Sequence, residues 1–304
     1  MKLIWLILLL ILGLELGLRL FVGLGNPLLY IADQEIGYLL APNQRVRRRG
    51  NLIVINEYSQ RNDNISQQLP ELRVLLLGDS IANGGWWTSQ VRTISALLTA
   101  KLEQELGVTV DVLNASANSW GPRNQLAYLQ KYGTFDSQII ILLLNTDDFF
   151  AIAPNSFLVG KSKHYPNQKP LLGMGELFNN FIRETTLPEM VKANQEKGDR
   201  VGFNLTAIAQ IHQLSQQNQA QLIIALTPLQ RESLSESKEH EIKARQRLDS
   251  LISSLEITYL DFLPLFQQVN SPDSLYRDHI HLNSRGNQLV VDNLTIEVVG
   301  RMKN

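Results

Sequence analysis

The chain has 304 residues, of which 44% are hydrophobic, and its 28 basic and 29 acidic side chains leave a formal net charge of −1. That length allows one sizeable hydrophobic core, and so small a net charge gives no overall attraction to nucleic acid or to an acidic membrane surface. Because the chain has no cysteine, disulfides, thiol catalysis and cysteine-ligated zinc are excluded.

The first 25 residues have the pattern of a membrane anchor. Residues 3–22 are apolar or glycine apart from Glu15 and Arg19. About twenty helical residues span the hydrocarbon core of a bilayer, and charges one turn apart can pair on one helix face. The alternative is a signal peptide cleaved after residues 23–25, which match an A-x-A site poorly. We therefore expect an uncleaved signal anchor over residues 1–25, with the rest of the chain on the extracytoplasmic, periplasmic side.

Residues 26–70 form a separate segment in this prediction. Two extended runs over residues 44–56 flank Gly50-Asn51 and predict a β-hairpin. The polar residues 62–70 are predicted to be a linker. The four arginines within residues 45–49 either contact lipid headgroups or an anionic polymer, or form a solvated hairpin face close to the membrane.

From residue 71 to residue 304, short apolar runs alternate with amphipathic stretches. The predicted strands are residues 72–77, 109–113, 139–144, 222–226 and 257–262, and the predicted helices are about 93–106, 122–132, 203–217, 237–255 and 284–298. The runs are nearly continuous in apolar residues, as expected of strands covered on both faces. This alternation predicts an α/β domain with a parallel sheet between helices, whose functional sites lie at the carboxyl ends of the strands.

One stretch, at about residues 149–200, interrupts the alternation. It is far longer than a usual connection between a strand and a helix. It is either a lid or substrate-binding insertion, or a packed decoration without a role in recognition.

The chemistry is concentrated in two motifs at opposite ends of this domain. Gly78-Asp79-Ser80 follows the first strand, and Asp278-x-x-His281 precedes the last helix. A serine needs a base to become a nucleophile, and an imidazole needs an orienting group. Ser80, His281 and Asp278 supply these three roles, which favours a serine esterase or an acyl-transfer enzyme. A metal site at Asp278, His279 and His281 lacks further ligands, and the glycines form no dinucleotide loop, so we expect neither a metal nor a cofactor.

Taken alone, each motif has a plainer interpretation, a turn or helix-capping serine and a structural Asp–His pair. Their order and spacing together resemble the first and last blocks of the SGNH/GDSL hydrolase superfamily over roughly residues 71–300. The resemblance implies a flavodoxin-like three-layer α/β/α fold with a five-stranded parallel sheet, and esterase, lipase or carbohydrate O-acyl chemistry. It makes Ser80 the nucleophile, His281 the base and Asp278 its orienter. The N-terminal helix and hairpin are similar in layout to membrane-tethered bacterial members.

The middle blocks of the superfamily, which help to bind the oxyanion, match less well. Ser119 stands where the family has a glycine, and a main-chain N–H survives that exchange, so the N–H groups of Ser80 and Ser119 remain candidates. Asp147 stands where the family has a donating asparagine, and an ionised carboxylate only accepts hydrogen bonds. Either Asn145 supplies the amide after a small register shift, which we favour, or Asp147 is kept protonated, or the reaction tolerates a weak oxyanion hole. The plainer alternative is that Asn145 and Asp147 only cap the strand end.

Together these observations predict a membrane-anchored serine esterase or O-acyl hydrolase. Its substrate would be a small-molecule or polysaccharide ester, from a cell-envelope carbohydrate or lipid, and its other partner the membrane, through the N-terminal helix. The alternatives are an O-acyltransferase that uses the same triad, and a catalytically weak glycan-binding protein. Of the other histidines, His164 either contacts substrate or lies on the surface, and His212 and His240 are expected to carry no chemistry.

Overall fold

The computed structural model describes residues 1–66, 68–181 and 187–302. Gln67 of the predicted linker, residues 182–186 of the predicted insertion and the last two residues of the predicted domain lie outside this part of the chain.

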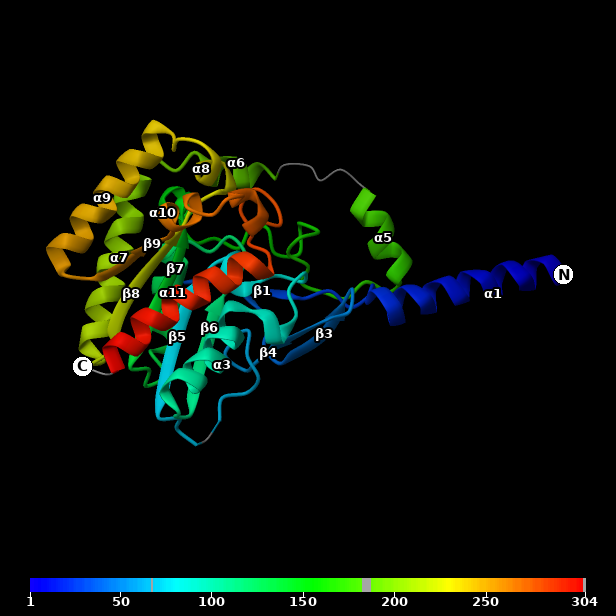
Figure 1. Ribbon diagram of the computed structural model, residues 1–304. Helices are drawn as coiled ribbons and strands as arrows, with labels where there is room; N and C mark the ends of the chain where they lie inside the picture. Colours follow the sequence, from blue (N-terminus) through cyan, green and yellow to red (C-terminus); the bar gives the residue numbers. More distant parts are fainter. Residues whose placement is uncertain (67, 182–186, 303–304) are drawn as a thin grey trace.

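A five-stranded parallel sheet forms the centre of the protein. Its strands are β5 (Leu72–Gly78), β6 (Val110–Ser116), β7 (Ile139–Asn145), β8 (Gln221–Thr227) and β9 (Thr258–Asp261). They lie in the order β6-β5-β7-β8-β9 (Figure 1), and all four pairings are parallel. In sequence order this is the 2-1-3-4-5 arrangement of flavodoxin-like sheets. The predicted fold class is confirmed, and each predicted strand is present with small shifts at its ends.

Helices cover both faces of the sheet. One layer consists of α3 (Ile94–Leu106), α10 (Phe262–Gln267) and α11 (Ser284–Met302), and the other of α4 (Pro122–Tyr132), α7 (Arg200–Gln217) and α9 (Glu239–Leu255). Shorter helices are α2 (Ser80–Asn83), α5 (Gly173–Phe181), α6 (Pro188–Asn194) and α8 (Gln230–Leu234), with 3₁₀ turns η2 (Gln90–Arg92), η3 (Thr146–Phe150) and η4 (Pro272–Leu275). The five predicted helices correspond to α3, α4, α7, α9 and α11.

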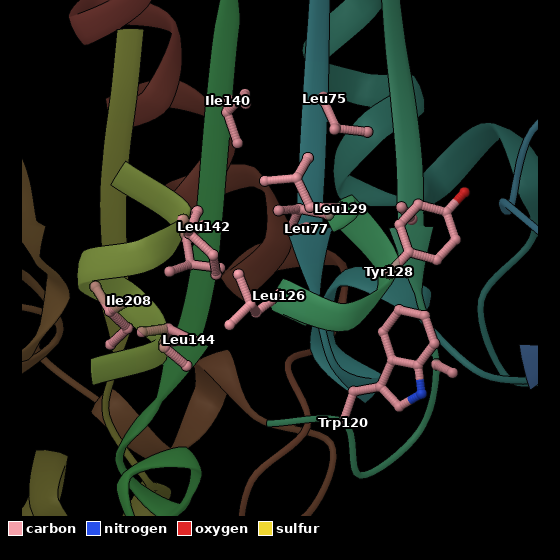
Figure 2. Packing of buried hydrophobic residues seen from close by; sticks show 14 of the residues in the cluster. Leu75, Leu77, Trp120, Leu126, Tyr128, Leu129, Ile140, Leu142, Leu144 and Ile208 are labelled. Atoms are coloured by element: carbon pink, nitrogen blue, oxygen red, sulfur yellow. The ribbon is translucent and has the colours of Figure 1, made fainter. Parts of the chain in front are cut away.

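Alternate residues of each strand enter opposite halves of the core, because side chains alternate across a strand. Figure 2 shows Leu75 and Leu77 of β5 on the side of α4, with Leu126 and Leu129 of that helix nearby. Leu76, between them, packs into the other half. Burying one such leucine contributes about 1.5–3 kcal/mol, so both helical layers are held to the sheet by its continuous apolar strands.

At the N-terminus, α1 (Lys2–Gly17) runs into a π-helical turn η1 (Leu18–Val22) and extends away from the rest of the chain (Figure 1). Residues 2–22 form a helix that, by its length and composition, is long and apolar enough to cross a membrane. Their large side chains are mostly exposed in the protein.

Two antiparallel hairpins follow this helix. One is formed by β1 (Tyr30–Asp33) and β2 (Gly37–Leu40), and the other by β3 (Gln44–Arg48) and β4 (Asn51–Ile55). The second is the predicted hairpin; the first was not predicted. Both pack onto the main core, where Leu40 and Ile53 join the same apolar cluster as α4. The indole N–H of Trp120 donates to the Tyr38 carbonyl at 3.0 Å, which ties the first hairpin to the loop after β6.

Candidate active site

The end of β5 positions Ser80. Asp79 caps the short helix α2, because its Oδ1 accepts the Ile81 N–H at 2.8 Å, and Ser80 is the first residue of that helix. A side chain at Gly78 would meet Ala82 Cβ at 2.5 Å, so only glycine lets α2 fold back so closely over the strand end. Ser80 therefore lies at the carboxyl ends of β5 and β7, where the strand order of the sheet reverses and sites commonly form.

The two motifs meet in space. His281 Nε2 lies 3.0 Å from Ser80 Oγ, and His281 Nδ1 lies 2.9 Å and 3.0 Å from the two carboxylate oxygens of Asp278. Asp278 Oδ1 also accepts the main-chain N–H groups of Ile280 and His281. Partial burial opposes ionisation of Asp278, but these hydrogen bonds outweigh it and lower its pKa. A carboxylate held ionised beside Nδ1 favours the tautomer that leaves Nε2 free to accept the serine proton.

Two tryptophans after the serine loop support the histidine. The Trp87 ring lies 4.6 Å from the imidazole of His281, centroid to centroid, in an edge-on arrangement. The Arg277 guanidinium lies 4.9 Å from the centroid of Trp87 and 5.3 Å from that of Trp86. The Arg277 N–H donates to the His281 carbonyl at 2.8 Å. Sequence reasoning missed this cluster, although Gly85-Trp86-Trp87 so close to Ser80 is a signal that could have revealed it.

A chain of buried polar groups lies beneath the serine. Ser80 Oγ donates to Asp79 Oδ2 at 3.2 Å as an alternative to its contact with His281. The same carboxylate oxygen accepts Asn145 Nδ2 at 2.9 Å, and the Asn145 main-chain N–H donates to Asp148 Oδ2 at 3.0 Å. Burial raises the pKa of Asp79, and burial together with the neighbouring Asp79 raises that of Asp148 well above the usual range. These two carboxyl groups therefore resist ionising together.

The predicted oxyanion residues occupy three different environments. Ser119 lines the same cavity as Ser80, and its φ of 59° lies in the left-handed region, which favours glycine. Its hydroxyl accepts a hydrogen bond from Tyr165 at 3.0 Å. Asn145 is buried, with one amide hydrogen on Asp79 and its carbonyl oxygen on the Asp147 N–H.

The Asp147 side chain is exposed and lines the cavity. Reduced hydration in the cavity wall and the carboxylates of Glu241 and Glu232 raise the pKa of Asp147. A carboxyl group held neutral carries one O–H donor, which the ionised form lacks.

Ser80 and His281 open into a cavity of about 640 Å³. The segment after β7 supplies much of its wall, including Phe150, Leu158 and Met190. His164 and His279 also line this cavity, and both are exposed. The Oδ1 atom of Asn118, another lining residue, is buried and has no hydrogen-bond partner in the described part of the protein.

The two remaining histidines lie away from Ser80. The His240 ring packs against Phe150, with centroids 5.2 Å apart, and His212 lines a separate hollow on α7, where burial lowers its pKa. Within residues 1–66, 68–181 and 187–302, no group of three His, Asp or Glu side chains is placed to hold a metal ion.

A serine, a histidine and a carboxylate at the carboxyl edge of a flavodoxin-like sheet define a hydrolytic type of site. Residues 76–289 match the GDSL-like lipase/acylhydrolase family. The chain belongs to this family and is an ester hydrolase, as the resemblance of the two motifs implied.

Several solved structures are similar to this chain. The acetyl xylan esterase AlAXEase is 16% identical, with a TM-score of 0.50 over 75% of this chain and 100% of its own. A lipolytic protein of the G-D-S-L family from Veillonella parvula DSM 2008 is 14% identical, with a TM-score of 0.48 over 76% and 99% of the two chains. Axe2, an acetylxylan esterase from Geobacillus stearothermophilus, is 10% identical, with a TM-score of 0.48 over 75% and 94%. A search of curated protein sequences gave no match.

Proposed function

We propose that the protein is a membrane-anchored serine esterase that removes O-acyl groups from a carbohydrate or lipid of the cell envelope. The observation that carries the proposal is the continuous link from Ser80 Oγ through the His281 ring to Asp278, with contacts of 2.9–3.0 Å.

In the acylation step, Ser80 Oγ attacks the ester carbonyl carbon while His281 Nε2 takes the hydroxyl proton. The resulting oxyanion is bound by the main-chain N–H groups of Ser80 and Ser119. A third donor comes from the segment Asn145–Asp147, through the second Asn145 amide hydrogen or a neutral Asp147. His281 then returns the proton to the departing alcohol oxygen, and the acyl group stays on Ser80.

In the deacylation step, water attacks the acyl-enzyme with His281 as the base, which releases the carboxylic acid and restores Ser80. Throughout, Asp278 holds the imidazole in position and stabilises its charged form.

The chemistry of the cavity supports a carbohydrate ester. Its wall combines the aromatic side chains Trp87 and Phe150 with polar side chains such as Asn118, a combination that suits a substrate with hydroxyl groups. One protein of similar fold is an acetyl xylan esterase, and acetyl xylan is an O-acyl polysaccharide.

Contacts at the base of α1 support an anchor that is retained. Glu15 accepts main-chain N–H groups from Gly173 at 2.7 Å and Met174 at 3.0 Å, and Arg19 donates to the Leu171 carbonyl at 2.6 Å. Cleavage after residues 23–25 would remove Glu15 and Arg19 and leave these partners without them.

The test uses the full chain in detergent and hydrolysis of p-nitrophenyl acetate and butyrate. Ser80→Ala and His281→Ala are expected to lower kcat by roughly 10⁴–10⁶-fold, whereas Ser250→Ala, an exposed serine on α9, leaves it unchanged. Full activity in Ser80→Ala would overturn the proposed mechanism. Comparing the size of the membrane-bound protein with that of the precursor tests whether the anchor is retained.

A further inference from the structure

The base of the anchor is fastened to helix α5 of the segment between β7 and α7. Glu15 of α1 accepts a 2.5 Å hydrogen bond from Arg19 Nε and the first two N–H groups of α5, those of Gly173 and Met174. Glu176 of α5 accepts the Gly25 N–H at 2.7 Å. Figure 1 shows α5 beside the base of α1, outside the two helical layers on the sheet.

The second β-hairpin completes this junction. Arg48 of β3 forms an ion pair with Glu176 of α5 and also donates to the Gly23 carbonyl at 2.6 Å. The Arg49 N–H donates to the Val22 carbonyl at 2.8 Å. The end of α1, the start of α5 and the tip of the hairpin therefore form one hydrogen-bonded unit, which we call the anchor junction.

Glu176 of α5 faces the anchor junction, whereas Phe178 and the two leucines before the helix are exposed. Gly173 packs against Leu24, and the Glu176 side chain is largely buried against Arg48. By contrast, Leu171 is 93% exposed, just before the helix, and Phe178 is 67% exposed. Met174 and Phe178 have the i, i+4 spacing of a single helix face, and Leu172, like Leu171, is exposed just before the helix.

The depth of α5 along the anchor matches a helix that lies in the membrane surface. The start of α5 contacts Glu15 and Arg19, which precede Val22 in the chain. At 1.5 Å per residue, these two side chains lie roughly 5–10 Å deeper in the membrane than Val22 along the helix axis. In-plane amphipathic helices bury their apolar face about 5–10 Å into the boundary between headgroups and acyl chains. The exposed Arg47 and Lys169, on the hairpin and just before Leu171, add positive charge suited to anionic headgroups.

We infer that α5 is an interfacial helix, and that Leu171, Leu172 and Phe178 insert into the outer boundary of the bilayer that α1 crosses. This inference rests on the membrane anchoring in the proposed function, but not on the catalytic step. Its occupant is the lipid surface, because the apolar face continues directly from a helix long enough to span the membrane.

The same segment also supplies part of the active-site wall. Phe150 and Leu158 before α5 and Met190 after it line the cavity that holds Ser80. Insertion of α5 therefore fixes the cavity at a set height and orientation over the membrane, which favours acyl esters presented at the lipid surface.

The chain has no cysteine, so single thiols can be introduced without removing any. We would place an environment-sensitive dye on Phe178→Cys, on Leu171→Cys and on a control, Ile296→Cys of α11, which is 72% exposed. A fourth variant, Leu10→Cys in the middle of α1, reports on the anchor. Each full-length protein is reconstituted into vesicles of phosphatidylcholine with phosphatidylglycerol, and dye emission is compared with and without brominated acyl chains.

We expect blue-shifted emission, and its loss with brominated lipid, at positions 178, 171 and 10 but not at 296. Quenching at position 10 without quenching at 171 and 178 would overturn the interfacial helix and leave the anchor intact. Absence of quenching at position 10 as well would overturn the membrane anchoring. A blue shift at 178 without lipid quenching would show that protein covers this face, such as a second copy of the chain, and would also overturn the inference. Hydrolysis of p-nitrophenyl acetate, measured on each labelled protein, confirms that it is folded.

Discussion

Replacing Asp147 by asparagine tests how this site binds an oxyanion. Asp147→Asn introduces the amide that the family resemblance leads us to expect at this position, on a side chain that already lines the Ser80 cavity. One oxyanion donor is worth about 2.7–4 kcal/mol, or 10²–10³ in kcat. If wild-type Asp147 is ionised at the assay pH, Asp147→Asn should therefore raise kcat by up to that factor.

The pH profile gives the sign of the effect. Because the pKa of Asp147 is raised above its ordinary value of 3.8, the neutral, donating form persists to higher pH than for a typical aspartate and is lost as the pH rises through the raised pKa. We therefore expect kcat/KM of the wild type to fall relative to that of Asp147→Asn as the pH rises through the raised pKa of Asp147.

The assay is hydrolysis of p-nitrophenyl acetate from pH 4 to pH 9, with Asp147→Ala as the matched control. Alanine removes the negative charge without adding a donor, so the difference between the two variants isolates donation from repulsion. An Asp147→Asn enzyme with the same kcat and the same pH profile as the wild type would refute the placement of Asp147 at the oxyanion. A loss of activity in Asp147→Asn would show that the carboxylate itself is needed.

Three further predictions concern the surroundings of the site. Asp148→Asn should reduce the fall in unfolding free energy that accompanies rising pH, because a buried carboxyl with a raised pKa stabilises the fold only below that pKa. Urea unfolding at pH 5 and pH 8 measures the unfolding free energy of both proteins. An equal fall between the two pH values in wild type and variant would contradict this prediction. Trp87→Ala should lower kcat/KM by about two- to tenfold through loss of the ring contact with His281, and Trp87→Phe should retain more activity. Equal kcat/KM in the wild type and both variants would count against a positioning role for Trp87. Leu77→Ala in the core should lower the unfolding free energy, measured by urea unfolding, by about 2–5 kcal/mol. The exposed Leu171→Ala should lower it by about 0.5 kcal/mol or less. A similar loss in both variants would contradict the packing of Leu77 in the core.

The sheet could be predicted from the sequence because its strands are buried on both faces. A run such as residues 139–144 has an apolar side chain at every position, and only a central parallel strand between two helical layers requires that. The link between Ser80 and His281 was equally accessible, since the two motifs follow a strand and precede a helix whose ends meet at one edge of the sheet.

The β1–β2 hairpin and its docking were not accessible in this way. Its strands are four residues each, too short for a periodic signal, and its position depends on remote partners such as Trp120. The anchor junction is of the same kind, because nothing local to Glu15 indicates that its carboxylate caps a helix that begins at Gly173. Contacts between side chains far apart in the sequence decide such features, and a single chain does not encode them as a pattern.

The assignment of Asn145 and Asp147 depends on where β7 ends. Asn145 is the last residue of the strand, and its side chain is held below Ser80 by Asp79 and by the Asp147 N–H. Asp147, the second residue of the following 3₁₀ turn, is exposed and also lines the cavity. Asn145 thus retains one amide hydrogen for substrate, whereas Asp147 donates only when neutral. Because both side chains line the cavity, the Asn145-Thr146-Asp147 sequence alone is compatible with either donor, and Asp147→Asn is the substitution that separates them.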